Sequence, residues 1–507
     1  MQFLIDILLL VVYAFFTLLV FAWCWRFWLL YAQQKHQSKI DWMMLEIKLP
    51  REINKSPLAM ENALTSLIHS SGVPVWWKRK ILGNLPIFSS LEIASIEGTI
   101  HFYFRVQRRF KNVVESNLYA QYPGIEIVEA EDYTKLIHYH HLSEDVEMWG
   151  MFYPLVKMWT PTDEKGKPWV DPKSKNGDDY KMKADYLPIK TYVDFGLDRD
   201  PKEEFKVDPL VPLLEFMGSI GKGEHVWYQV LVQDESNFNG SKFPKMYLNA
   251  MNHEHWSFAD LGNERKKQIR KIKKVKKDDP VYDENGIPRE TTVPKKDGSG
   301  SEVRAMVYVD NREIQEKKES QLTIDEKDEI EKINLKVSKP IVRVSVRIVY
   351  VAKKEKFNPS YIANTFNVMK NYNGGGNSLN AFSTVPVDDY DFPWENWQNK
   401  RAPWRKEEWF EEYVEREAFH IHAPDREELQ KWEDRAFWYF PLKTRKMWRM
   451  MYEGFLHPFD HPVSIKLSCM NLEEVATIYH FPGAMASVPN LPRIDSAKSV
   501  APTNLPQ

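Results

Sequence analysis

The order of strand-like and helix-like patterns is the feature that most constrains how this chain can fold. After residue 40, an alternating apolar segment, an amphipathic segment, a hairpin pattern around Glu97 and Gly98, a second amphipathic segment and a last short strand pattern follow one another. Period-two alternation predicts strands, and a 3.6-residue period predicts helices. This order predicts a ferredoxin-like βαββαβ module over residues 40–134. Its expected strands are 44–49, 91–96, 100–106 and 125–130, and its expected helices are 57–69 and 110–121.

The same order of patterns returns over residues 188–390. Asp208 and Asn358 stand where a helix N-cap is expected. A long insertion, residues 234–339, separates the two middle strands of this second module. We therefore expect an α+β protein with two tandem ferredoxin-like modules, the second of which carries a charged helical-hairpin insertion. The expected strands of the second module are 189–195, 226–233, 341–351 and one that starts at 381–382, and its expected helices are 209–220 and 359–372.

Length and composition leave room for two or three domains with cores of their own. The chain has 507 residues and a formal net charge of −2, so the overall charge gives no argument for nucleic acid. Cys24 and Cys469 are the only cysteines, which excludes a disulfide framework and fits a reducing compartment. The expected segments are an anchor at 1–34, module 1 at 40–134, a connector with a loop insertion at 135–187, module 2 at 188–390, a Trp-rich helical closing region at 391–483 and a tail at 484–507.

An uncharged, almost wholly apolar run extends from Ile7 to Trp25 and is followed by Arg26. Its length nearly matches the roughly 30 Å hydrocarbon core of a bilayer, and the long Arg26 stem can reach the headgroups. The alternative is a cleaved signal peptide, which requires a basic start, a shorter apolar core and small residues at the cleavage site. We favour a single transmembrane helix. Because Lys and Arg follow the run and none precedes it, we expect a short N-terminus outside the cell membrane and the bulk of the chain in the cytoplasm.

A strongly basic stretch, residues 264–277, lies in the insertion of the second module. Its sparse apolar residues predict a helix with one thin apolar stripe. One interpretation is contact with an acidic surface: lipid headgroups, nucleic acid or an acidic partner. We favour a solvated hairpin, in which the acidic stretch 325–331 pairs with the basic one. The candidate contact residues are Arg265, Lys266, Lys267, Arg270, Lys271, Lys273 and Lys274.

A region dense in Trp and charged residues, 393–465, follows the second module. Aromatic residues three and four positions apart favour core packing over a platform for stacking nucleobases. The basic side chains Arg445, Lys446 and Arg449 beside Trp448 are the candidates here for contact with a phosphate backbone or a partner protein.

No catalytic constellation is recognisable in the sequence. Residues 218–223 (GSIGKG) lack the spacing of a Walker A loop and the Ser or Thr after its Lys. The Gly-rich segment 373–377 follows an expected helix, so the helix dipole has the wrong sense for phosphate and a turn is favoured. The histidines at 138–141, 253–255 and 420–422 have no Cys partner at metal spacing, which favours ordinary surface histidines over a metal site. We predict no enzymatic activity, no metal and no cofactor.

Six segments of the chain carry a resemblance to a known family. In content and order they resemble the N-terminal, non-ATPase half of a bacterial membrane-anchored family related to the conjugation and type IV secretion ATPases of the FtsK-like P-loop class. The resemblance covers nearly the whole chain. It supplies no catalytic residues, because the phosphate-binding motifs of the longer relatives lie in their other half. The segments are MLEIKLPREINKSPLAMENAL, FSSLEIASIEGTIHFYFRV, YAQYPGIEIVEAEDYT, LPIKTYVDF, FPLKTRKMWRMMYEGFLHP and LEEVATIYHFPG…LPR…APTNLP.

The C-terminal tail, residues 484–507, is rich in Pro and Ser and lacks apolar periodicity, which is typical of a linker. The resemblance implies that this segment leads into the ATPase domain in longer relatives. We therefore expect a separate P-loop ATPase to dock at the tail. The candidate docking residues are Pro489, Pro492, Arg493, Asn504, Leu505 and Pro506.

Together these observations give a leading functional hypothesis and an alternative. The leading hypothesis is a non-catalytic, membrane-anchored scaffold subunit that docks a P-loop ATPase in a type IV secretion or conjugation-like system for DNA or protein transfer. The alternative is a membrane-tethered protein that binds nucleic acid through its basic patches. The expected partners are the lipid bilayer, the separate ATPase and further copies of the chain, with nucleic acid left open.

Overall fold

A computed structural model describes most of the chain between residues 40 and 494. The described ranges are 40–67 (without 52 and 54), 88–140, 145–160, 182–198, 207–234, 245–248, 255–270, 290–294, 302–306, 322–383 (without 375), 401–416, 467–483 and 490–494, together with single positions before residue 40, at 77–87 and at 418. All structural statements below concern these residues.

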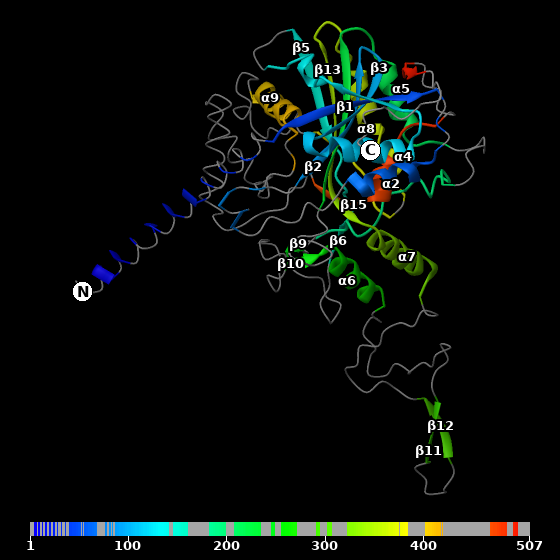
Figure 1. Cartoon of the computed structure of the whole chain (residues 1–507). Coiled ribbons are helices and arrows are strands. Elements are labelled where there is room, and N and C mark those ends of the chain that lie inside the picture. Colours follow the sequence, from blue (N-terminus) through cyan, green and yellow to red (C-terminus); the bar gives the residue numbers. More distant parts are fainter. Residues whose placement is uncertain are drawn as a thin grey trace. The chain divides into compact units, whose positions relative to one another are not determined.

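One large, almost wholly antiparallel sheet of ten strands organises the fold (Figure 1). The strand order is β14-β5-β13-β8-β2-β3-β1-β16, with β15 beside β13 and β4 beside β1. The pairing of β16 with β1 is parallel. The structure is therefore α+β.

Residues 42–130 form the first βαββαβ module (module 1). β1 pairs with both β3 and β4, and β2 pairs with β3, all antiparallel, which gives the order β4-β1-β3-β2. This is the split βαβ arrangement of a ferredoxin-like module. The Glu97-Gly98 turn joins β2 to β3 with a positive φ at both residues, 53° and 90°, as a tight hairpin turn requires. The elements are β1 (Trp42–Pro50), α2 (Pro57–Leu67), β2 (Phe88–Ile96), β3 (Thr99–Gln107), α4 (Lys111–Gln121) and β4 (Glu126–Ala130).

A second βαββαβ module (module 2) repeats this arrangement within the same sheet. β5 pairs with β13 and β14, and β13 pairs with β8, which gives the order β14-β5-β13-β8. Strand for strand, this is the order of module 1. The elements are β5 (Val146–Phe152), α5 (Val211–Gly218), β8 (Glu224–Asp234), β13 (Ile341–Lys353), α8 (Ser360–Asn367) and β14 (Phe382–Ser383).

The first strand of module 2 differs from the sequence expectation. Residues 189–195, expected as a strand, form turns instead, because the Asp194 side chain and the Thr191 carbonyl take up local backbone N–H groups. Asp194 Oδ2 accepts from Thr191 N at 2.8 Å, and Phe195 N donates to Thr191 O at 3.2 Å. Such local hydrogen bonds compete with a strand ladder. The strand that fills this place, β5, lies in the segment expected to be a connector.

The two modules join edge to edge through β2 and β8. These strands pair antiparallel from Phe88↔Gln233 to Ile96↔His225, with Glu92 opposite Gln229 at the centre. The two strands hold the same position in their modules, so an approximate two-fold axis passes near Glu92 and Gln229. The expected tandem modules are thus halves of one sheet.

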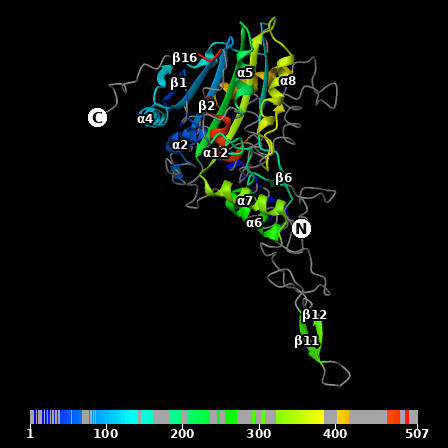
Figure 2. The ribbon, with the colours of Figure 1, turned by 90° about the vertical axis from the view of Figure 1, so that its right-hand side faces the viewer.

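Both faces of this sheet are covered. One face packs its apolar side chains against α2, α4, α5, α8 and α12 (Leu472–Ile478) in the main hydrophobic core, and these helices lie in front of the sheet in Figure 2. The opposite face carries a smaller aromatic cluster that includes Trp227, Tyr133 and Tyr413. There the sheet is covered by α9 (Arg401–Val414) and residues 133–139.

The C-terminal elements run across both modules. β15 (Ser468–Asn471) pairs with the first residues of β13, and α12 follows it at once with a capping box between Asn471 and Glu474. Glu474 also accepts from Ile189 N at 2.9 Å. β16 (Arg493–Ile494) then lies beside the end of β1.

A separate compact unit consists of residues 156–188 and 245–339. Its helices α6 (Phe258–Arg270) and α7 (Ile324–Ser338) pack closely at Gly262, where an added Cβ would lie 3.0 Å from Ile333 Cγ2. Its strands form three two-stranded pairs: β6 (Met158–Trp159) with β7 (Met182–Lys183), β9 (Lys245–Leu248) with β10 (His255–Ser257), and β11 (Glu290–Pro294) with β12 (Glu302–Met306).

The expected transmembrane anchor is wrong. Ile7 and Trp25 have helical backbone, and Arg26 lies outside the described residues. Among the described residues, no helix is both long enough and apolar enough to cross a bilayer, whose hydrocarbon core requires about 20 apolar residues. This finding overturns the anchor at 1–34 and the single-pass placement in a cell membrane that was derived from it.

Candidate functional site

The candidate site is a buried polar cluster at the centre of the sheet, where the two modules meet. Tyr103, Glu92, Gln229 and Arg347 lie opposite one another on β3, β2, β8 and β13. Directly opposed residues of antiparallel strands project from the same face. A row of four polar side chains therefore crosses the junction on the face that α9 covers.

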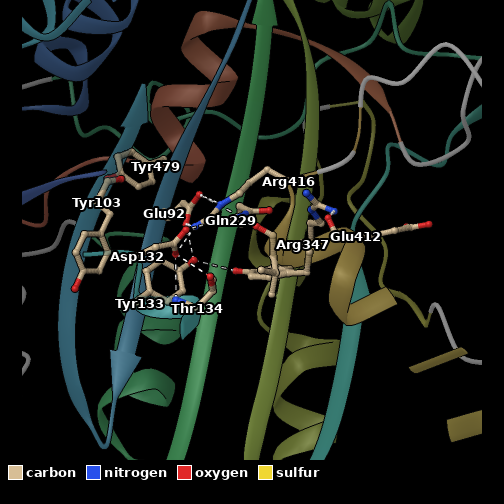
Figure 3. Close-up of polar contacts among 12 residues, drawn as sticks. Glu92, Tyr103, Asp132, Tyr133, Thr134, Gln229, Arg347, Glu412, Arg416 and Tyr479 are labelled. Carbon is tan, nitrogen blue, oxygen red and sulfur yellow. Dashed lines mark hydrogen bonds and ion pairs between the residues drawn. The ribbon is translucent and has the colours of Figure 1, made fainter. Parts of the chain in front are cut away.

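Arg416, two residues after α9, is the central cation of this cluster (Figure 3). Nε and Nη2 donate to Glu92 Oε1 and Oε2, both at 3.1 Å. Nη1 and Nη2 donate to Asp132 Oδ2 and Oδ1, at 2.5 and 2.9 Å. A fifth bond joins Nη1 to Val414 O at 2.7 Å. A guanidinium has five N–H donors, so these contacts match its whole donor capacity.

Glu92 is completely buried and receives further donors. Tyr133 Oη donates to Oε2 at 2.5 Å, and Gln229 Nε2 donates to Oε1 at 3.1 Å. Burial alone would raise the pKa of Glu92, but the charge of Arg416 and its hydrogen bonds hold that pKa below the usual value. For Tyr133, burial and the nearby Glu92 charge raise the pKa well above its ordinary value. Glu92 is therefore ionised and Tyr133 is a neutral donor at neutral pH.

A second buried cation, Arg347, lies beside this cluster. Its Nη1 donates to Glu412 O in α9 at 3.2 Å, and its guanidinium carbon lies 5.5 Å from the centre of the Tyr413 ring. Burial lowers the pKa of Arg347 to about 10. Both arginines thus connect the sheet to α9 or to the residues that follow it.

The position of α9 depends on a glycine in β5. An added Cβ at Gly150 would lie 2.1 Å from the Trp409 ring, so only glycine leaves room for Trp409 against the strand. Lys406 also pairs with Glu147 of β5. α9 therefore rests on module 2, whereas Arg416 after it binds Glu92 of module 1 and Asp132, which lies just after β4.

The cluster is a structural ion-pair network that joins separate elements of the fold. Arg416 is 2% exposed, its donors all meet protein acceptors, and both carboxylates accept from it. Such a buried network fixes the geometry of the groups that it joins. The arrangement supports holding two modules and a helix together.

On the helical face, His480 makes a second ionic connection. His480 Nδ1 lies 3.0 Å from Ala476 O, and Nε2 lies 3.2 Å from both carboxylate oxygens of Asp208. Burial alone would lower the pKa of His480, but the Asp208 charge and hydrogen bonds raise it above the usual value. Since both neighbours are acceptors, both ring nitrogens donate and His480 is an imidazolium. It joins the end of α12 to Asp208, which accepts from Leu210 N just before α5.

The predicted basic residues of the insertion are partly described. Arg265 on α6 donates to Glu329 on α7 at 2.8 and 3.1 Å, and Lys266 donates to Asn334 Oδ1 at 3.0 Å. Lys267 and Arg270 are exposed. Pairing of the basic helix with the acidic one is thus present at Arg265. Lys271, Lys273, Lys274, Arg445, Lys446 and Arg449 lie outside the described residues.

Of the predicted docking tail, two residues are described. Pro492 and Arg493 lie at the end of β1, where Arg493 Nη1 donates to Pro50 O at 3.1 Å. Pro489, Asn504, Leu505 and Pro506 lie outside the described residues. Within the described ranges, no three His, Cys, Asp or Glu side chains come together to hold a metal ion.

None of the four charged residues of the central cluster, Glu92, Asp132, Arg347 and Arg416, was among the candidates from the sequence. Glu92 stands between Leu91 and Ile93 in an alternating strand, which places it on the solvent face by the period-two rule. The available signal was the dense aromatic spacing of residues 404–413, which pointed to a packed element without saying what it covers.

No family model, no curated protein and no solved structure matches this chain.

Proposed function

We propose that this protein is a non-catalytic scaffold subunit that docks a separately encoded P-loop ATPase in a type IV secretion or conjugation-like system for DNA or protein transfer. The resemblance of its sequence motifs motivates the proposal. The transmembrane anchor is no part of it.

The observation that carries the proposal is the defined position of residues 490–494 on the described structure. Ile100 N donates to Asn490 O and Arg51 N donates to Ile494 O, each at 3.2 Å, and Leu491 is buried in the main core. Within the tail, which in the resemblance leads into the ATPase, residues 490–494 therefore lie at a defined place on module 1. A base of two interlocked modules with a tail at one defined place suits a subunit that positions a motor.

The test is co-purification of the tagged full-length chain from its native cells. We expect a P-loop ATPase in the eluate, and its loss when Asn504, Leu505 and Pro506 are changed to Ala. The matched control is Ile324→Ala, since Ile324 is 87% exposed on α7 in the separate unit. An eluate without any P-loop ATPase overturns the proposal.

A second candidate function is nucleic-acid binding by α6. Lys267 and Arg270 are exposed there, although Arg265 is paired with Glu329. If Lys267 and Arg270 each contact a phosphate, we expect their replacement by Ala to make the plot of log affinity against log salt concentration less steep, by about 1 unit of slope per residue. The control is Lys327→Ala on α7, which removes one exposed charge elsewhere. An affinity of the wild-type chain that is insensitive to salt excludes this function.

A further inference from the structure

Residues 490–494 are held in the manner of a bound extended peptide. They run parallel to the end of β1, with Leu49 opposite Arg493 and Pro50 opposite Ile494. On one side Arg51 N donates to Ile494 O, and on the other Ile100 N at the start of β3 donates to Asn490 O. Main-chain pairing of this kind is how an added strand gains affinity without regard to its side chains.

Three side chains of the segment add selectivity. Leu491, 6% exposed, enters the main core. Asn490 Nδ2 donates to Gly218 O at the end of α5 at 2.5 Å, and Arg493 Nη1 donates to Pro50 O at 3.1 Å. The side-chain amide of Asn490, the apolar side chain of Leu491 and the guanidinium of Arg493 thus contact the end of α5, the main core and the end of β1, respectively.

The walls of this position are held together by contacts that do not involve the segment. The Glu97-Gly98 turn before β3 packs so closely on α5 that a Cβ at Gly98 would lie 2.6 Å from Ile220 O. Gly223 N also donates to Glu97 Oε1 at 3.0 Å. We name the end of β1, the start of β3 and the end of α5 the β16 site. These elements are joined to one another by contacts that do not involve the segment.

The hold on the segment is small beside that on other strands. β16 pairs with β1 at two positions, Arg493 and Ile494, whereas β2 pairs with β8 along its whole length. Short, peripheral pairings open before central ones do. Loss of the segment would remove the β1–β16 pairing and leave the pairing of β1 with β3 and β4 intact.

We propose that the β16 site is a docking site for an extended peptide and that residues 490–494 of a second copy of this chain bind it when the segment of the first copy is detached. The bonds formed are identical in both cases, so exchange between copies costs no contacts. Exchange of an identical element is a low-cost route to dimers. The proposal does not rest on an ATPase partner and is tested without one.

The test uses the full-length chain with Leu491→Asp, which detaches the segment because it places a charge in the apolar core. The probe is a fluorescent peptide with the sequence of residues 488–495. We expect it to bind the variant at least 10-fold more tightly than the wild-type chain, in which the tethered segment competes at an effective concentration of about 1 mM. A peptide that carries the same Leu491→Asp change should bind neither chain. Equal binding to variant and wild type, or no binding to a variant of unchanged circular dichroism, overturns the proposal.

A measurement on the wild-type chain applies even if the variant does not fold. The amides of Arg51 and Ile100, which donate to the segment, should exchange hydrogen together, faster than the amide of Phe104 in the middle of β3. Excess free peptide should slow that exchange, because it refills the site. Exchange of both amides as slow as that of Phe104 shows that the segment does not leave, and so contradicts the proposal.

Discussion

At the scale of single residues, Arg416 is the cation that binds both carboxylates of the central cluster, Glu92 and Asp132. Its backbone has a positive φ of 56°, a conformation that is unfavourable for a residue other than glycine. Its five N–H groups donate to Glu92, Asp132 and Val414. The strained backbone is held in place by these bonds. Packing and ionic contacts together therefore determine the conformation of Arg416.

Removal of this cation should be costly. We expect Arg416→Met to lower the free energy of unfolding by about 3–5 kcal/mol, because Glu92 would be left as an uncompensated buried charge and the half-buried Asp132 would lose its cation. Adding Glu92→Gln to that variant should recover part of the loss. Chemical unfolding of the wild type, both single variants and the double variant measures the coupling. Strictly additive losses would show that the ion pair is not coupled as described.

The imidazolium of His480 gives a pH dependence of definite sign. Its folded pKa is raised, so its contribution to stability is full below the unfolded value of about 6.5 and is lost as the pH rises through the folded value. Burial alone would raise the pKa of Asp208, but the His480 charge and hydrogen bonds lower it. The contribution of Asp208 to the free energy of unfolding is therefore lost only as the pH falls well below neutrality. The denaturant concentration at the unfolding midpoint should be higher for the wild type than for His480→Gln at pH 6, and this difference should become smaller as the pH is raised to 9.

His225 provides the control of opposite sign. Burial lowers its pKa, so His225 is neutral in the folded state, and its contribution is lost as the pH falls through the folded value. The unfolding midpoint of the wild type relative to His225→Gln should therefore fall as the pH drops below the unfolded value of about 6.5, and it should stay level from pH 7 to pH 9. Parallel trends for the two variants would contradict the assignment of charge to His480.

At the scale of elements, the docking of α9 depends on the missing side chain of Gly150. Gly150→Ala should displace Trp409 and cost about 1–3 kcal/mol, as overpacking does, and hydrogen exchange in α9 should speed up. Gly221→Ala is the matched control, since a Cβ there meets only Glu224 Oε2 at 3.4 Å. Unchanged exchange in α9 of the Gly150→Ala variant would show that Trp409 does not hold the helix.

Most elements of module 1 could be predicted from local pattern. The expected strand 100–106 is β3 (Thr99–Gln107), and the expected helix 110–121 is α4 (Lys111–Gln121), because both have one apolar face with a clear period. β5 could not be found this way. It is buried on both faces at its end and contains Gly150, so neither alternation nor strand propensity marks it.

At the scale of the whole molecule, the pairing of β2 with β8 makes one sheet from two modules. On one face α12 packs against α2 of module 1, and Thr477 Oγ1 in α12 accepts from Tyr192 N at 2.9 Å. On the other face α9 contacts β5 of module 2, and Arg416 after it binds Glu92 of module 1. Fragments 1–140 and 145–507 should therefore assemble with equal stoichiometry when they are expressed together. Affinity purification through a tag on the first fragment checks this.

A charge reversal at the centre of the junction is the control for that experiment. Glu92→Lys would place a second cation against Arg416, which should abolish the assembly of the fragments. Assembly that survives this change would show that the junction does not depend on the central cluster.

Local periodicity predicts the type and order of most elements, because it reports which side of a segment is apolar. It did not determine which strand edges meet, since β2 and β8 carry no local mark of their pairing. Nor could it place the buried cluster. Glu92 has the period of a solvent-facing residue and becomes buried only because α9 and Arg416, more than 300 positions away, cover that face. Burial of the second sheet face depends on the elements that pack on it, and these are brought there only by the folding of distant segments.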